Sequence, residues 1–120
     1  MPPAEHAARL HRLLAKLRRR RLDGAVITHP VARFYYTGVA SSAGALWVDV
    51  REGPLFAVDF RYLFMARAAL PFMPCALQKA GEAAVRSPWL RRARRWRRCG
   101  YEGREPASAL RRRQEQLPGV

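Results

Sequence analysis

Residues 45–58 read ALWVDVREGPLFAV, and the fold prediction starts from this stretch. Two apolar runs, Ala45 to Val50 and Leu55 to Val58, enclose the polar segment Arg51-Glu52-Gly53-Pro54. That segment has the length and the Gly and Pro content of a hairpin turn, so the two runs are expected to pair as antiparallel strands. Asp59 follows at once and is well placed to cap a helix.

Upstream of the hairpin the pattern predicts a helix, a strand and a helical turn. Residues 4–20 carry apolar side chains at helical spacing, and the basic side chains between them are expected to face water. The apolar set is Ala7, Leu10, Leu13, Leu14 and Leu17, and the basic set is Arg9, Arg12, Lys16 and Arg19. Asp23-Gly24 ends this helix, and residues 25–28 form a short strand. His29-Pro30 then starts a helical turn that Thr37-Gly38 closes.

Downstream of the hairpin, helices and strands are expected to alternate. The expected elements are a helix from Asp59 to about Leu70, a strand within residues 72–77, a helix over 80–98, a strand at 99–103 and a polar helix at 106–116. Pro74 cannot donate to a strand ladder, so its strand should lie at an edge or pair only in its second half. Trp89, Ala93 and Trp96 share one face of the helix over 80–98.

This order of elements predicts an α/β fold with a mixed sheet of four or five strands flanked by helices, because a single layer cannot bury both of its apolar faces. A chain of 120 residues has the length of one domain. We expect that domain to occupy residues 1–105 and to be followed by the polar C-terminal helix and tail at 106–120.

The charge balance is strongly basic, with 23 lysines and arginines against 9 acidic residues, and 21 of the 23 are arginine. The arginine clusters lie at residues 18–21, 91–98 and 111–113. Two explanations stay open. Arginine binds phosphate oxygens bidentately, so the chain would be a small nucleic-acid-binding protein with Arg91, Arg94 and Arg95 as candidate anion-binding residues. A GC-rich genome would produce the same excess without selection for binding. The arrangement of arginines on the folded surface distinguishes the two.

The cysteines predict neither a disulfide framework nor a zinc site. Cys75 and Cys99 have no CxxC motif and no histidine at ligand spacing, and we expect small buried residues in a reducing cytoplasm. No apolar run reaches the ~18 residues that span a bilayer, which predicts a soluble chain. Tyr35-Tyr36 and the Trp89/Trp96 pair are expected to be core aromatics rather than base-stacking platforms, because their spacing buries a helix face.

Four further motifs occur in order along the chain, after an Arg-Leu-x-Arg-Leu helix at 9–13 and the stretch LDGAVIT at 22–28. They are HPVARFYYTG at 29–38, SSAGAL at 41–46, LFAVDFRY at 55–62 and CGYEG at 99–103. With these motifs, roughly residues 5–105 resemble the N-terminal domain of the creatinase, prolidase and Xaa-Pro aminopeptidase metallopeptidases. The chain departs from the family pattern at His29 and Ala32, where Asn or a similar polar residue is usual.

The resemblance implies a ribonuclease H-like layout and a parent activity of a metal-dependent Xaa-Pro aminopeptidase or dipeptidase. In such peptidases a C-terminal catalytic domain supplies two Asp, one His and two Glu that bind a pair of divalent metals. Neither catalytic residues nor a metal or other cofactor site is expected in this chain, and no activity is expected from it alone. The implied role is a non-catalytic accessory, oligomerisation and cleft-lining domain, in a truncated or stand-alone form, whose partner is a second copy or a catalytic peptidase domain.

Asp59, Arg61, Tyr62 and Tyr35 are the candidate cleft-lining or partner-facing residues. In the family that the chain resembles, the edge of this domain approaches the catalytic cleft, where an arginine such as Arg61 would hold a substrate carboxylate. The alternative role is structural. In that case Asp59 caps a helix, and Arg61 pairs with a carboxylate at the end of the sheet.

Overall fold

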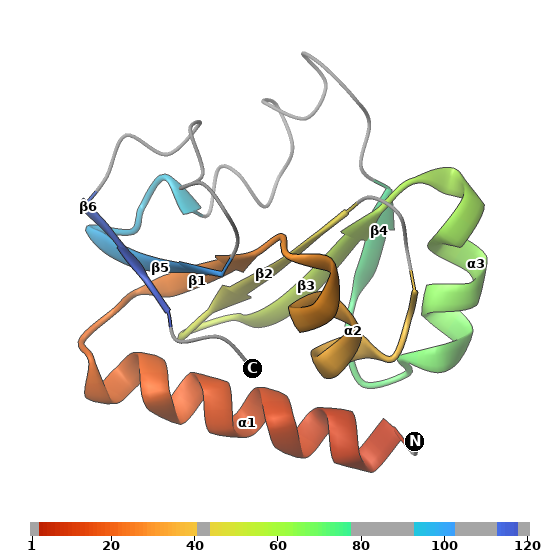
Figure 1. The fold of residues 1–120 in the computed structure, drawn as a ribbon, viewed down its shortest axis with the longest axis horizontal. Helices are drawn as coiled ribbons and strands as arrows, with labels where there is room; N and C mark the ends of the chain where they lie inside the picture. The colour runs from red at the N-terminus through yellow and green to blue at the C-terminus, as the bar shows by residue number, and fades with distance from the viewer. Residues whose placement is uncertain (1–2, 41–43, 78–92, 103–112, 118–120) are drawn as a thin grey trace.

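The predicted hairpin forms two adjacent inner strands of the observed sheet (Figure 1). The structure is a computed structural model that describes residues 3–40, 44–77, 93–102 and 113–117. Strands β2 (Ala45–Asp49) and β3 (Gly53–Val58) pair antiparallel, as predicted. The turn between them is closed by Asp49, whose Oδ1 accepts hydrogen bonds from the N–H groups of Arg51 and Glu52 at 2.8 and 3.0 Å.

Among the described residues, six strands form one mixed sheet in the order β4-β3-β2-β1-β5-β6. The other four strands are β1 (Gly24–Ile27), β4 (Cys75–Leu77), β5 (Arg98–Glu102) and β6 (Arg113–Gln116). β1 is antiparallel to β2 and parallel to β5, and the parallel pairs β3–β4 and β5–β6 complete the two edges. The predicted α/β class is confirmed, with one strand more than the four or five expected. β4 lies at an edge and begins after Pro74, as predicted.

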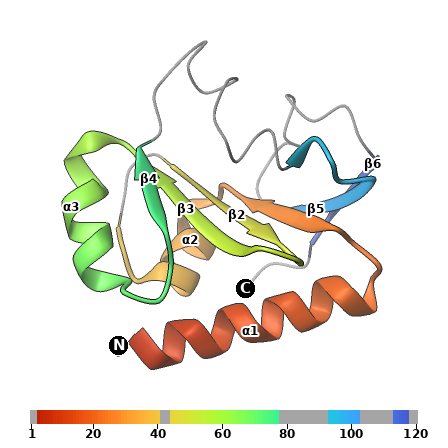
Figure 2. The same cartoon turned by 180° about the vertical axis from the view of Figure 1, so that it is seen from behind.

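Helices α1 (Pro3–Arg19) and α2 (Pro30–Thr37) lie on one face of the sheet, and α3 (Phe60–Ala69) packs against β3 and β4 (Figures 1 and 2). Leu10, Leu13 and Leu17 of α1 are buried, as predicted, and Leu14 is half-buried. The same core contains Leu22, Ile27, Leu46, Val48, Phe56 and Val58. Each buried leucine stabilises the fold by about 1.5–3 kcal/mol relative to an exposed one, so α1 is held mainly by its apolar face.

The ends of α2 follow the local sequence. His29 caps its N-terminus, since Nδ1 accepts a hydrogen bond from the N–H of Val31 at 3.3 Å, and Pro30 takes the first helical position. Gly38 ends the helix with a φ of 70°, in the left-handed region that favours glycine. The buried ring of His6 packs against this glycine, where a Cβ would lie 2.6 Å from Nε2.

The small-residue loop before β2 brings two backbones close together. At Gly44 the φ is 137°, and a Cβ would lie 2.7 Å from the carbonyl oxygen of Ala57. Arg33, a buried residue of α2, donates from Nη1 to the Gly44 carbonyl oxygen at 2.7 Å. Gly44 is thus the point of close approach in the described part of this loop, and residues 41–43 lie outside the described residues.

The helix predicted over residues 80–98 is wrong at its C-terminal end. The N–H groups of Arg97 and Arg98 bond to Oδ2 of Asp23 at 2.7 and 3.1 Å, so they do not continue a helical ladder, and β5 begins at Arg98. Residues 78–92, which include Trp89, lie outside the described residues. Ala93 and Trp96, expected on the buried face, are buried.

The polar helix predicted over residues 106–116 is also wrong at its end, because residues 113–116 form β6. The strand pairs with β5, and the buried Leu117 packs against Gly100, where a Cβ would lie 2.8 Å from Leu117 Cδ2. The sequence Arg-Gln-Glu-Gln has no apolar alternation, and an edge strand commonly carries charged side chains, so the usual strand signal is missing. Residues 106–112 lie outside the described residues.

Candidate functional site

Tyr35 lies in a groove between α1 and α2. Arg9 donates from Nη1 to the Tyr35 carbonyl oxygen at 2.7 Å, and its guanidinium carbon lies 4.0 Å from the centre of the Tyr35 ring. The sequence pattern placed Arg9 in water, but its side chain is only 16% exposed, because these contacts hold it against α2. The groove has a volume of about 470 Å³, and basic side chains of α1 and both tyrosines line it.

Tyr35 and Tyr36 pack edge to face, with ring centres 5.0 Å apart. Tyr36 is buried, and this burial, with a smaller contribution from Tyr35, raises the pKa of Tyr36 to about 12. Nδ1 of the buried His6 lies 3.1 Å from the Tyr35 carbonyl oxygen. The prediction that both tyrosines are core aromatics is confirmed for Tyr36, which is buried. Tyr35 is only partly buried, and it packs against the core.

Asp59, Arg61 and Tyr62 interact with one another at the start of α3. Asp59 Oδ1 accepts from the N–H of Arg61 at 3.0 Å, and Arg61 Nη2 lies 2.7 Å from Asp59 Oδ2. The Arg61 guanidinium carbon lies 5.3 Å from the centre of the Tyr62 ring. Hydrogen bonding from the Arg61 side chain lowers the pKa of Asp59 below its ordinary value. Asp59 thus caps α3, as predicted, and it is also the carboxylate at the end of β3 with which Arg61 pairs. Both contacts are those expected if these residues have a structural role.

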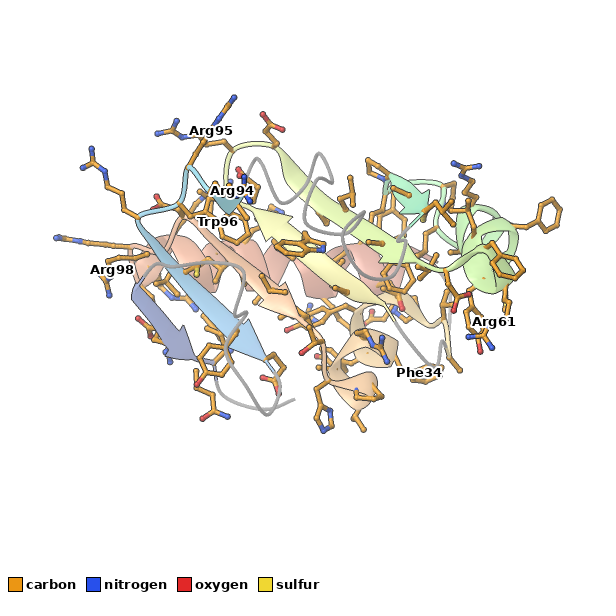
Figure 3. All side chains as sticks on the ribbon, turned by 90° about the horizontal axis from the view of Figure 1, so that it is seen from above. Phe34, Arg61, Arg94, Arg95, Trp96 and Arg98 are labelled. Carbon is orange, nitrogen blue, oxygen red and sulfur yellow. The ribbon has the colours of Figure 1, made fainter. Side chains whose placement is uncertain are left out.

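The candidate anion-binding arginines lie at the other end of the sheet, where β1 and β5 begin and β2 ends. Figure 3 shows Arg94, Arg95 and Arg98 extending there, opposite Arg61. Arg91 lies outside the described residues. We name this region the arginine end, and it comprises Arg18, Arg19, Arg20, Arg21, Arg51, Arg94, Arg95, Arg97 and Arg98. Contacts between elements join it: Arg18 donates to the Val50 carbonyl oxygen at 3.1 Å.

A hollow of about 470 Å³ at the arginine end is lined by Arg51, Arg95, Arg97 and Trp96 and by three carboxylates, those of Asp23, Asp49 and Glu52. Asp49 Oδ2 accepts from Trp96 Nε1 at 2.8 Å, and Asp23 accepts from two backbone N–H groups. Sequence reasoning missed the roles of Asp23, Asp49 and Trp96. The role of Asp23 has one signal in the sequence, an acidic residue directly before a buried strand. The role of Asp49 has none, because its partner Trp96 is 47 residues away in sequence.

The described residues do not fit a metal pair. They contain no group of three or more His, Cys, Asp or Glu side chains that could hold a metal ion. Three of their carboxylates, those of Asp23, Asp49 and Asp59, already accept hydrogen bonds from the backbone. Cys75 and Cys99 are buried free thiols, as predicted, and burial raises the pKa of Cys99 to about 11. No described helix combines the length and the apolar character needed to cross a bilayer.

Solved structures with the same fold are peptidases and isolated domains of peptidases. The N-terminal domain of the cytoplasmic peptidase PepQ from Mycobacterium tuberculosis H37Rv is 26% identical with a TM-score of 0.68, and the match covers 92% of this chain and 91% of that one. A proline dipeptidase structure from Streptococcus agalactiae 2603V is 19% identical with a TM-score of 0.73, covering 93% and 94%. An Xaa-Pro dipeptidase from Bacillus anthracis is 18% identical with a TM-score of 0.75, but the match covers 93% of this chain and only 33% of that one.

The fold and the described side chains define an α/β domain with a mixed six-stranded sheet and, in its described part, no cluster of side chains that could hold a metal ion. The family model described as the creatinase/prolidase N-terminal domain matches residues 9–120. The chain therefore belongs to the creatinase/prolidase N-terminal domain family. It spans about a third of the Bacillus anthracis dipeptidase chain. A comparison with curated proteins found no match.

Proposed function

We propose that this chain is a non-catalytic accessory domain of the Xaa-Pro peptidase type that associates through α3. The family match over residues 9–120 supports the domain type. The observation that carries the association is the outer face of α3, where Phe60 and Phe64 are 78% and 87% exposed. Residues four apart lie on the same side of a helix, so the two rings form one apolar stripe.

A second copy of the chain is the proposed partner of this stripe. Two α3 helices related by a two-fold axis would bury four phenylalanine rings, which is roughly 600–1,000 Å² of apolar surface. Stable interfaces bury at least about 1,200 Å² in total, so the rings would supply half or more of a small interface. The Asp59–Arg61 pair at the start of α3 places a charged rim beside it. This is the partner-facing role proposed for Asp59 and Arg61.

The purified chain is expected to form a dimer with a dissociation constant on the order of 10 µM, as expected for an interface near the lower size limit. Replacing both Phe60 and Phe64 by serine removes the apolar stripe and should leave a monomer at all concentrations. Sedimentation velocity over a concentration series measures the change. The single variant Phe34→Ser is the matched control, because Phe34 is 52% exposed on α2 and should leave dimerisation intact. A chain that stays monomeric at millimolar concentration would contradict self-association and leave a catalytic domain as the partner.

No Xaa-Pro peptide hydrolysis is expected from this chain alone. Hydrolysis by a metal pair requires a bridging cluster of carboxylates, which the described residues lack. The purified chain is incubated with Xaa-Pro dipeptides and tripeptides in the presence of added manganese, cobalt or zinc, and free amino acids are quantified. Turnover that follows the chain through each purification step and disappears with chelator would contradict the non-catalytic assignment.

A further inference from the structure

The described arginines are concentrated at one end of the molecule. Of the fourteen arginines with described side chains, nine belong to the arginine end. They come from three separate parts of the chain, namely the last turn of α1 with the residues after it, the turn between β2 and β3, and residues 94–98. Codon usage alone would scatter arginines over the surface, whereas the fold gathers them.

The described carboxylates at this end pair with only some of these arginines. The described carboxylates here are Asp23, Asp49, Glu52 and Glu115. Glu115 pairs with Arg20 at 3.0 Å and with Arg98 at 3.2 Å, whereas Asp23 and Asp49 bond to backbone N–H groups and to Trp96. Among the described residues, no carboxylate pairs with Arg19, Arg21, Arg51, Arg95 or Arg97, and all five are exposed.

We infer that the arginine end binds the phosphate backbone of double-stranded nucleic acid. Neighbouring strands are about 4.8 Å apart, so the five strands from β3 to β6 span roughly 19 Å. That width exceeds both grooves of B-form DNA, which are about 6 and 12 Å wide, so arginines at the two sides can reach phosphates on both strands. Guanidinium groups bind phosphate oxygens bidentately.

The distribution of apolar side chains favours a duplex over other polyanions. All exposed large apolar residues among the described ones lie on α2, on α3, in β4 or just before β4, and none belongs to the segments that form the arginine end. Single strands are bound by stacking bases on exposed aromatic rings, and membrane surfaces are bound by inserting apolar side chains. The arginine end offers neither, so its contacts are to phosphates and do not depend on sequence.

The test uses the full chain and fluorescein-labelled 20-bp DNA duplexes of two unrelated sequences, followed by fluorescence anisotropy between about 50 and 200 mM salt. Both duplexes should bind equally. The double variant Arg51→Gln/Arg95→Gln removes two exposed cations from separate elements. Each lost phosphate contact reduces the slope of log affinity against log salt concentration by about 0.9, so the double variant should reduce it by about 1.8. The affinity at 0.1 M salt should then fall on the order of 50-fold.

The charge-matched control is Arg12→Gln/Arg67→Gln, which removes two exposed arginines outside the arginine end. It should lower affinity less than fivefold. Circular dichroism and thermal unfolding check that both variants keep the fold. An equal loss in the two variants, no duplex binding at 0.1 M salt, or tighter binding to a single-stranded 20-mer or to anionic phospholipid vesicles would overturn the inference. Since Phe60 and Phe64 are unchanged in both variants, this result is independent of self-association through α3.

Discussion

The Gly24→Ala variant is expected to lose about 3–5 kcal/mol of unfolding free energy. A Cβ at Gly24 would lie 2.2 Å from Cζ2 of Trp96, whose side chain is 3% exposed and hydrogen-bonded to Asp49. The φ of Gly24 is not positive, so the methyl group itself, and not backbone strain, causes the effect. The indole must leave its site, which costs about as much as deleting a buried tryptophan side chain. Urea unfolding followed by circular dichroism measures the loss.

A double-mutant cycle isolates this cause. In the Trp96→Ala background the space above Gly24 is empty, so Gly24→Ala should then cost less than about 1 kcal/mol. The same cost in both backgrounds would show that a group other than Trp96 excludes the methyl group.

Leu17→Ala is expected to lower the unfolding free energy by about 2–5 kcal/mol. Leu17 is fully buried between α1 and the sheet, and the substitution removes its apolar contacts and leaves a cavity that the rigid sheet cannot fill. The same substitution at Leu14, half-buried on the same helix, leaves no closed cavity and should cost less than half as much. Urea denaturation of both variants makes the comparison. Equal losses would place α1 in a different orientation on the sheet.

Most of the fold could be predicted where the signal is local. The hairpin from Ala45 to Val58, the cap at Asp59 and the left-handed Gly38 each depend on contacts within a few residues. Turn and cap residues act on their own backbone, so their sequence position is enough to locate them.

The errors fall where a distant partner replaces a local one. Arg97 and Arg98 do not take the predicted helical conformation, because Asp23, more than 70 residues earlier, accepts their N–H groups. β6 is polar and is a strand only because β5 offers it an edge. Arg9 is partly buried because the Tyr35 ring and carbonyl lie beside it. None of these partners is visible from sequence spacing.

Some candidate site residues interact with near neighbours in sequence, and others are brought together only by the fold. The Asp59–Arg61 pair joins residues two apart, so a sequence pattern can indicate it. The arginine end joins α1, the β2–β3 turn and the start of β5, because the strand order puts β1 between β2 and β5. Sequence by itself therefore determined the class of fold, the hairpin, the helix caps and the arginine excess, since these follow from local backbone preferences and composition. The tertiary structure alone placed that charge at one end of the sheet and the exposed phenylalanines on α3, since strand order and helix packing depend on contacts between residues far apart in the chain.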